Sequence, residues 1–139
     1  MSTPIEETLV LVKPDGVARQ LTGEILCRIE AKGYVIADLK MVTASKDLLH
    51  AHYEEHQGKP FFEPLVEFML SGPVVAIRLQ GNRVIEGFRS LAGTTDPTTA
   101  APGTIRGDLG RDWGLKVAQN LVHGSDSPES SARELALWF

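Results

Sequence analysis

The sequence predicts an α+β fold, a ferredoxin-like α/β sandwich in which a four-stranded antiparallel sheet is covered by helices. Short β-branched and apolar runs alternate with longer segments whose apolar residues recur at helical spacing. Gly and Pro residues separate these segments, and no internal repeat, low-complexity tract or long linker divides them. The chain has 139 residues, 42% of them apolar, so we expect residues 1–139 to fold as a single domain.

The first predicted strand is the run TLVLV at residues 8–12, which Pro14 ends. It contains no polar residue after its first, so we expect it to be buried. Thr22 is the expected N-cap of a helix over about residues 23–32, which Gly33 terminates.

The next segments predict a strand followed by a pair of helices. Residues 34–43 have the composition of a second strand. Ser45 is the expected N-cap of a helix that runs through Tyr53. A second short helix is expected over about residues 61–70 and ends before Pro73.

The second half of the chain predicts a strand at 74–79, a helix that starts at Asn82 and a short strand at 121–122. Between the last two, residues 92–119 lack periodicity and are rich in Gly, Pro, Thr and Asp. Irregular segments of this length inside a compact domain are usually functional. A final helix is expected to begin after the N-cap Ser127, because a proline follows it.

Composition and charge argue against several classes of protein. The net charge is -4 without a basic stripe, so we expect no dedicated nucleic-acid binding. The N-terminus lacks a signal-peptide pattern and no apolar run reaches about 20 residues, so we expect no membrane span and a cytoplasmic location. Cys27 is the only cysteine, which rules out an intrachain disulfide, and its apolar neighbours predict a buried thiol.

Glycine-rich phosphate-binding motifs are absent, since neither G-x-x-x-x-G-K-[ST] nor G-x-G-x-x-G follows a strand. Side chains must therefore hold any bound phosphate. Lys13 follows the first strand, Arg89 lies near a helix end, and Arg106 lies in the Gly-flanked turn GTIRGD. Arginine binds phosphate oxygens bidentately and lysine acts as a point charge. Each cation alone is more typical of a solvated surface, although Arg106 is the strongest candidate because packing does not explain it.

His123 is the strongest candidate nucleophile in the sequence. It follows the last predicted strand and precedes Gly-Ser-Asp-Ser, so its side chain is expected at a strand end near a helix N-terminus. A neutral imidazole can attack phosphorus there, and a helix start favours an anionic phosphoryl group. Glu134 is expected to fold back and hydrogen-bond the other ring nitrogen, which would fix the tautomer. From this segment alone, a histidine that only caps a turn is the more frequent interpretation.

The segment HYEEH at residues 52–56 matches H-x-x-E-H, the pattern of inverted zinc proteases. Two histidines four residues apart on a helix can bind zinc. The motif is short and arises often by chance, and a protease would need a larger scaffold with a substrate cleft. We expect instead that its His and Glu side chains form a solvated face opposite Leu48 and Leu49.

Five motifs occur in order along the chain: TLVLVKPDGV, HYEEHQGKPFF, SGPVVA, PGTIRGD and NLVHGSDSPES. Together they resemble nucleoside diphosphate kinase of the bacterial type along essentially the whole chain. The combination of NxxHGSDS with an upstream GTIRGD is highly specific. The resemblance implies transfer of the terminal phosphate of a nucleoside triphosphate, mainly ATP, to a nucleoside diphosphate. The implied route is a ping-pong mechanism through a phosphohistidine, which maintains nucleoside triphosphate pools.

The resemblance also implies a role for each matching residue. His123 would be the nucleophile, attacking through Nδ1, and Ser125 and Glu134 would hydrogen-bond around it. The implied contacts to phosphate and sugar are Lys13, Tyr53, Arg89, Thr95, Arg106 and Asn120.

The implied base contacts are Phe61, which would stack on the base, its apolar neighbour Leu65, and Val117. Val117 lies in the segment 109–119, which makes the chain longer by about four residues than the family members compared with it. Nucleotide preference and assembly therefore follow less directly from the resemblance than the chemistry of His123 does.

The resemblance further implies Mg²⁺, bound mainly to the nucleotide phosphates without a direct protein ligand. It implies a homo-oligomer, for which we expect a hexamer in preference to a tetramer. An alternative function is a nucleotide-sensing or structural oligomer module without turnover. The presence of the histidine and of every phosphate-binding cation disfavours that alternative, and a coupled assay with ATP and dTDP distinguishes the two.

Overall fold

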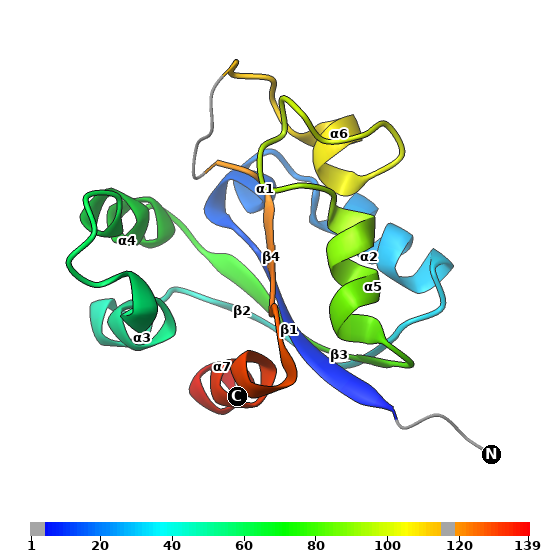
Figure 1. Ribbon diagram of the computed structural model, residues 1–139, viewed down its shortest axis with the longest axis horizontal. Helices are drawn as coiled ribbons and strands as arrows, with labels where there is room; N and C mark the ends of the chain where they lie inside the picture. The colour runs from blue at the N-terminus through cyan, green and yellow to red at the C-terminus, as the bar shows by residue number, and fades with distance from the viewer. Residues whose placement is uncertain (1–4, 115–118) are drawn as a thin grey trace.

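The computed structural model describes residues 5–114 and 119–139. Its strands are β1 (Glu6–Val12), β2 (Val35–Val42), β3 (Val74–Gly81) and β4 (Val122–Gly124). They form a four-stranded sheet in the order β2-β3-β1-β4, in which every neighbouring pair is antiparallel (Figure 1). The predicted sheet is therefore confirmed.

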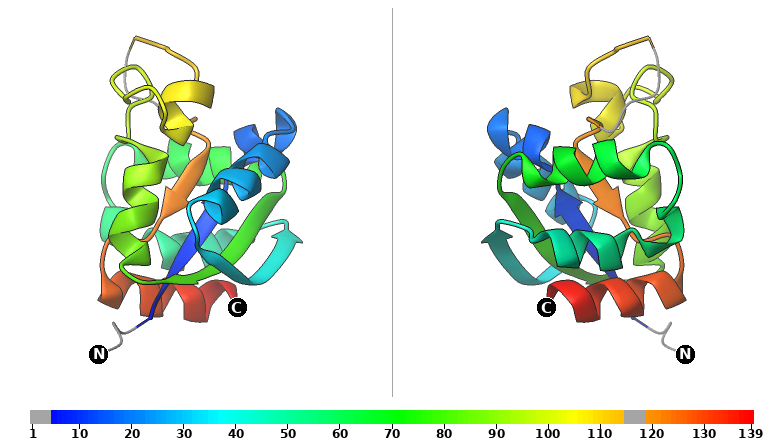
Figure 2. Two further views of the ribbon diagram at one scale, coloured as in Figure 1. Left: turned by 90° about the vertical axis from the view of Figure 1, so that its right-hand side faces the viewer. Right: turned by 90° about the vertical axis from the view of Figure 1, so that its left-hand side faces the viewer.

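Helices cover both faces of this sheet. Their bounds are α1 (Pro14–Ala18), α2 (Thr22–Ala31), α3 (Lys46–His52), α4 (Phe62–Leu70), α5 (Val84–Ala92), α6 (Ile105–Leu109) and α7 (Pro128–Trp138), with a 3-10 turn η1 (Glu54–His56). Helices α2 and α5 lie on one face, and α3, α4 and α7 on the other (Figure 2). The arrangement agrees with the sandwich that the sequence predicts.

The central strand β1 contributes to two hydrophobic cores, one on each side of the sheet. Val10 and Val12 point into the core beneath α2 and α5. Leu9 and Leu11 point into the core beneath α3, α4 and α7. All four side chains are completely buried, and each such burial contributes about 1.5–3 kcal/mol. The sheet is therefore a rigid base for the loops at its end.

Helix capping agrees with the sequence at two of the three predicted positions. The hydroxyls of Ser45 and Ser127 each accept a hydrogen bond from the backbone N–H three residues on. The prediction for Thr22 was wrong, because α2 begins at Thr22 itself and Leu21 occupies the N-cap without a side-chain bond. Gly33 does follow the end of α2, in the left-handed conformation with φ +102°.

Other boundaries also differ from the predictions. The short helices α1 and α6 fall where a turn and an irregular segment were expected, since helices of one turn leave little periodicity. Helix α5 starts at Val84, after Arg83 in the left-handed conformation. Cys27 is exposed, which contradicts the expected buried thiol, because α2 turns Ile25 and Ile29 inward instead. Among the described residues no helix is long and apolar enough to cross a membrane.

Candidate active site

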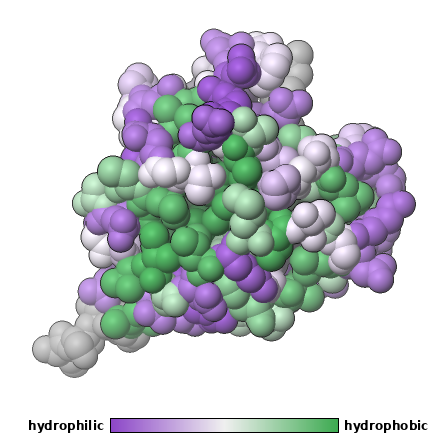
Figure 3. Space-filling view, turned by 180° about the vertical axis from the view of Figure 1, so that it is seen from behind, coloured by the Kyte–Doolittle hydropathy of each residue, from purple (hydrophilic) through white to green (hydrophobic). Residues whose placement is uncertain are grey.

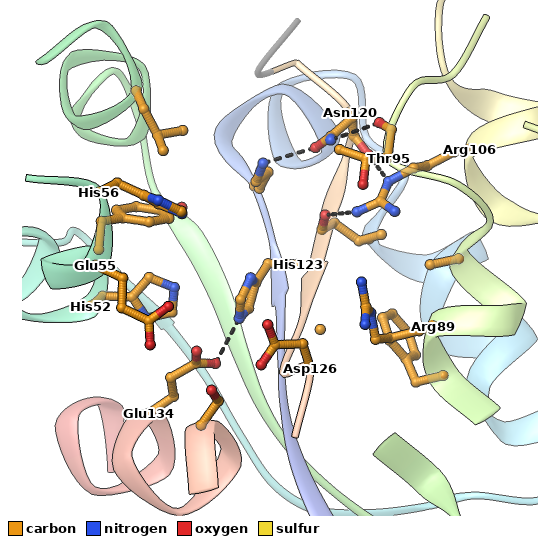
Figure 4. Close-up of a pocket in the computed structure, with 18 of the residues that line it drawn as sticks. His52, Glu55, His56, Arg89, Thr95, Arg106, Asn120, His123, Asp126 and Glu134 are labelled. Atoms are coloured by element: carbon orange, nitrogen blue, oxygen red, sulfur yellow. Dashed lines mark hydrogen bonds and ion pairs between the residues drawn. The ribbon is translucent and has the colours of Figure 1, made fainter. Parts of the chain in front are cut away.

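A polar pocket opens where β4 meets the loops at the end of the sheet. Helix α3 with η1 and α7 form one side, and α5 with α6 forms the other (Figure 4). The sequence candidates that line it are Lys13, Tyr53, Leu65, Arg89, Thr95, Arg106, Asn120, His123 and Glu134. Segments that are far apart in the sequence therefore meet around His123.

His123 lies within β4, paired with Leu11 of β1, and not beyond the strand as expected. Its Nε2 lies 2.7 Å from Glu134 Oε1, so the predicted approach of α7 is confirmed. Ser125 Oγ donates to the same carboxylate oxygen at 2.7 Å. Burial raises the pKa of Glu134, but the hydrogen bond and charge of His123 and the bond from Ser125 outweigh it, so the pKa lies below its usual value.

A carboxylate is only an acceptor, so it binds the neutral imidazole through an Nε2–H group. The lone pair of that tautomer is on Nδ1. Among the described residues, none hydrogen-bonds Nδ1 of His123. The ring, with a side chain 19% exposed, is therefore held at one nitrogen and has its basic nitrogen available in the pocket.

Lys13 and Asn120 form the buried part of the opposite side. Lys13 Nζ donates to Asn120 Oδ1 at 2.8 Å, and Asn120 Nδ2 donates to the carbonyl oxygen of Thr95 at 2.9 Å. Burial, followed by the charge of Arg106, lowers the pKa of Lys13 to about 8, against the opposing effect of Asp15. The ammonium group is therefore charged at neutral pH, although it is almost completely buried.

Arg106 lies in the first turn of α6, where the sequence predicted an irregular turn. Its guanidinium donates from Nε to Asn120 O at 3.1 Å, from Nη1 to Gly93 O at 2.9 Å and from Nη2 to Val122 O at 2.7 Å. Burial, and then the nearby charge of Arg89, lowers the pKa of Arg106 to about 10. Arg106 thus joins α6 to the chain that enters β4, and it keeps two further N–H groups for a ligand.

Steric crowding explains why glycine follows Arg106 in GTIRGD. A Cβ at Gly107 would lie 1.9 Å from the carbonyl oxygen of Ala101, so only glycine fits. Thr104 caps α6 by accepting a hydrogen bond from the N–H of Gly107 at 2.9 Å. Arg89, by contrast, is an exposed residue of α5 whose side chain is directed into the pocket in Figure 4.

His52 is a site residue whose position differs from the prediction. It was expected on a solvated face, but it is 4% exposed, and its ring lies 4.7 Å from the His123 ring between centroids. Trp138 Nε1 donates to His52 Nδ1 at 3.0 Å, so Nδ1 carries no proton. Burial, and then the neighbouring His123, lowers the pKa of His52 to about 3, which keeps the ring neutral.

The packing of α7 against the end of α3 explains this position. Arg133 Nη1 donates to the carbonyl oxygen of Ala51 at 2.9 Å, which caps the end of α3. Arg133 Nη2 also donates to the carbonyl oxygen of His52 at 3.5 Å, and Trp138 provides a further bond between the helices. An apolar α7 face that ends in a tryptophan was the only signal in the sequence for a buried polar partner, because a buried indole N–H needs an acceptor.

Three potential metal ligands meet in this region. His52, His123 and Glu134 offer ligand atoms within 4.8 Å of one another, the one such group among the described residues. Because Trp138 donates to Nδ1, the proton of the neutral His52 ring is on Nε2. A metal bound at Nε2 would move that proton to Nδ1, and His52 could then no longer accept the hydrogen bond from Trp138. This group contains His52 but not His56, so it is not the zinc site that HYEEH suggested, and its geometry favours two hydrogen-bonded imidazoles.

The side expected to contact a base is more open. Tyr53 is buried with no hydrogen bond to its hydroxyl among the described residues, and burial raises its pKa. Phe61 does not line the pocket directly. It is 49% exposed and packs against the His56 ring at 5.2 Å, which itself lines the pocket. Val117 lies outside the described residues, so its predicted place near the base stays a prediction.

Comparison with known proteins agrees with this geometry. A family model described as nucleoside diphosphate kinase matches residues 6–139. The nucleoside diphosphate kinase of Mycolicibacterium gilvum is 62% identical over 135 residues, which cover 96% of each chain. That of Streptomyces avermitilis is 59% identical with the same coverage.

Solved structures of the same name have the same fold. A nucleoside diphosphate kinase from Halobacterium salinarum in complex with CDP has a TM-score of 0.92 and 46% identity, and the match covers 98% of this chain and 88% of that one. The enzyme from Encephalitozoon cuniculi has a TM-score of 0.91 and 38% identity, covering 96% and 88%. The chain therefore belongs to the nucleoside diphosphate kinase family and is a phosphotransferase that acts between nucleotides.

Proposed function

We propose that His123 carries the phosphoryl group between the two nucleotides. The observation that supports this most strongly is the bond of its Nε2 to Glu134, which leaves Nδ1 as the basic nitrogen in a pocket lined with cations. Nδ1 attacks the terminal phosphorus of the triphosphate, and the bond to the bridging oxygen breaks. The diphosphate leaves with that electron pair. A second diphosphate then takes the phosphoryl group by the reverse sequence.

The cations of the pocket stabilise the charge that develops on the transferred group. Lys13, Arg89 and Arg106 come from three separate elements and line the same space. Transfer to phosphorus depends more on positioning and charge neutralisation than on proton transfer. Asn120 and Thr95, which hold Lys13 through a hydrogen-bonded chain, act as further polar contacts to the phosphates and sugar.

Enzymes of this family generally depend on a divalent metal ion, and we propose that Mg²⁺ serves here. The cationic pocket does not suit a bare divalent ion held by protein ligands, and Asp126 and Glu55 are its only exposed carboxylates among the described residues. The ion therefore arrives on the nucleotide phosphates, whose charge it neutralises. Lys13 and the arginines then position the phosphate oxygens that the ion leaves free.

We propose that Phe61 and Leu65 hold the base, with Tyr53 near the sugar and phosphates. Stacking tolerates any base because each has a π-face, and an exposed ring at the pocket edge suits it. The Halobacterium relative was solved with CDP, which supports a nucleotide in the corresponding place. We further propose a cytoplasmic location and no dedicated nucleic-acid binding, in keeping with the net charge of -4.

We propose a homo-oligomer, a hexamer in preference to a tetramer. Strand β2 lies at the edge of the sheet, and Val35, Leu39 and Met41 on it are 59%, 46% and 61% exposed. Figure 3 shows apolar side chains gathered on the face where β2 lies. An exposed edge strand with apolar side chains favours pairing with another chain. Sedimentation equilibrium would measure the assembly, and a monomer at micromolar concentration would contradict it.

Replacement of the nucleophile tests the proposed function. Incubation of the wild-type chain with ATP should give a phosphoprotein that is labile in acid and stable in base. His123→Ala should form none and should lose transfer from ATP to dTDP by more than about 10⁴-fold, as loss of a covalent nucleophile does. Full transfer activity in that variant would overturn the assignment.

A further inference from the structure

Leu121, two residues before His123, has a strained backbone. Its φ is +75°, in the left-handed region that side chains larger than glycine rarely adopt. Such a conformation is energetically unfavourable and persists only where its surroundings impose it. Its side chain is completely buried in the core beneath α2 and α5, so a glycine here would leave a cavity. The chain therefore enters β4 through a residue that must be held in place.

The segment that follows β1 holds both backbone groups of Leu121. Its carbonyl oxygen accepts from the N–H of Lys13 at 2.8 Å, and its N–H donates to Asp15 Oδ2 at 3.1 Å. Asp15 lies in the first turn of α1, beside the start of β4 (Figure 1). A Cβ at Gly16 would lie 3.2 Å from the same carbonyl oxygen, so α1 packs directly on this point.

The environment of Asp15 is costly for a carboxylate. Burial raises its pKa, against the effects of Lys13 and of the Leu121 N–H. Its second oxygen, Oδ1, is buried without a hydrogen bond to any described residue. Asp15 does not line the pocket, although its charge acts on Lys13 and Arg106, which do line it. Its hydrogen bond to Leu121 is the specific contact that the geometry assigns to it.

We propose that Asp15 is a positioning residue, which aims His123 into the pocket through the backbone of Leu121. Without this acceptor the Leu121 N–H is buried and unpaired, and the backbone relaxes from the left-handed conformation. The start of β4 then shifts, and the His123 ring shifts with it. A displacement of about 1 Å at a reacting group can cost about 10²-fold in rate. The inference rests on the proposed role of His123 as the nucleophile.

Two substitutions at Asp15 separate the effect of its hydrogen bond to Leu121 from the effect of its negative charge. Asp15→Ala removes the acceptor and the charge, whereas Asp15→Asn keeps an oxygen that accepts from Leu121 and removes only the charge. We expect kcat for transfer from ATP to dTDP to fall about 10²-fold in D15A and to stay within about threefold of wild type in D15N. Any change in KM should be shared by both variants, because both lose the charge beside Lys13.

Asp47→Ala is the matched control, since Asp47 is an exposed carboxylate in the first turn of α3. Circular dichroism of each variant checks that the fold is kept, and D15N keeps the test valid if D15A does not fold. A wild-type kcat in D15A, or an equal loss in D15N, would overturn the positioning role. Absence of transfer activity in both the wild-type and D47A proteins would instead refute the proposed function. Failure of the positioning role and failure of the proposed function therefore give different results.

Discussion

The two sides of the pocket hold their side chains in different ways. On the nucleophile side, which comprises His52, His123, Ser125 and Glu134, side chains hold one another: Glu134 bonds to His123 and Ser125, and the His52 ring packs against that of His123. The cation side comprises Lys13, Arg89, Arg106 and Asn120. There the guanidinium of Arg106 bonds to the backbone, since it donates to three carbonyl oxygens. A substitution on the nucleophile side should therefore disturb the tautomer and orientation of one ring. A substitution on the cation side can also loosen the chain that enters β4.

Arg106 and Arg89 give the sharpest contrast and the largest expected effect. Arg106→Ala should reduce kcat/KM by about 10³-fold, because the substitution removes a cation that stabilises the charge on the transferred phosphoryl group. It should also lower the free energy of unfolding by about 2–4 kcal/mol, because buried carbonyl oxygens lose their donors. Arg89→Ala should reduce kcat/KM without lowering stability, since Arg89 is exposed. Urea denaturation beside steady-state kinetics would measure both, and equal stability of the two variants would remove the contrast.

Glu134 tests the nucleophile side alone. Glu134→Ala should reduce the rate of His123 phosphorylation by about 10²-fold, because the imidazole loses the acceptor that fixes its tautomer. Glu134→Gln keeps an acceptor oxygen and should lose less. Rapid-quench measurement of the phosphoprotein with ATP gives these rates. If the alanine and glutamine variants lose the same rate, the charge at residue 134 matters and the acceptor oxygen does not.

The lowered pKa of Lys13 predicts opposite effects of pH on activity and stability. Above pH about 8 the folded chain loses the Lys13 proton, so kcat/KM, which reports the free enzyme, should fall. The unfolded chain keeps that proton up to about pH 10.5, so it binds more protons than the folded chain between these values. The contribution of Lys13 to stability should therefore rise with pH in this window. Lys13→Ala should abolish both trends. If kcat/KM of that variant still falls at alkaline pH as in the wild type, a group other than Lys13 causes the fall.

The pair formed by Trp138 and His52 should give the smallest effect. Trp138→Phe removes the donor to His52 Nδ1 but keeps an aromatic ring in the core, so we expect a loss of about 1 kcal/mol in stability. The rate of phosphorylation should fall severalfold while nucleotide KM changes less, because the His52 ring lies 4.7 Å from that of His123 and reaches the nucleotide contacts only through its edge-on packing with Tyr53. Phe139→Leu, at the next residue, is the control. A larger change in KM than in the rate would place His52 in nucleotide binding instead.

Most of the fold was predictable because strand and helix patterns are local. Ser45 and Ser127 mark helix starts, and the run from Thr8 to Val12 marks the central strand. The misplaced features are those that depend on distant partners. Thr22 looks like a cap but is the first residue of α2, with Leu21 at the N-cap, and His52 looks like a surface residue until Trp138 covers it. The short helices α1 and α6 are held in place by hydrogen bonds between their side chains and Leu121, Gly93 and Val122, which lie elsewhere in the chain.

The sequence by itself determined the family, the alternation of strands and helices, and most of the residues that meet in the pocket, because motifs and periodicity are properties of the chain alone. Only the tertiary structure decided which nitrogen of His123 is bonded, which of the cations is also a backbone support, and that Asp15 holds a strained Leu121. These features arise where the burial of polar groups forces each donor to find an acceptor. Residues more than 100 positions apart, such as Asp15 and Leu121, meet only when the sheet has formed.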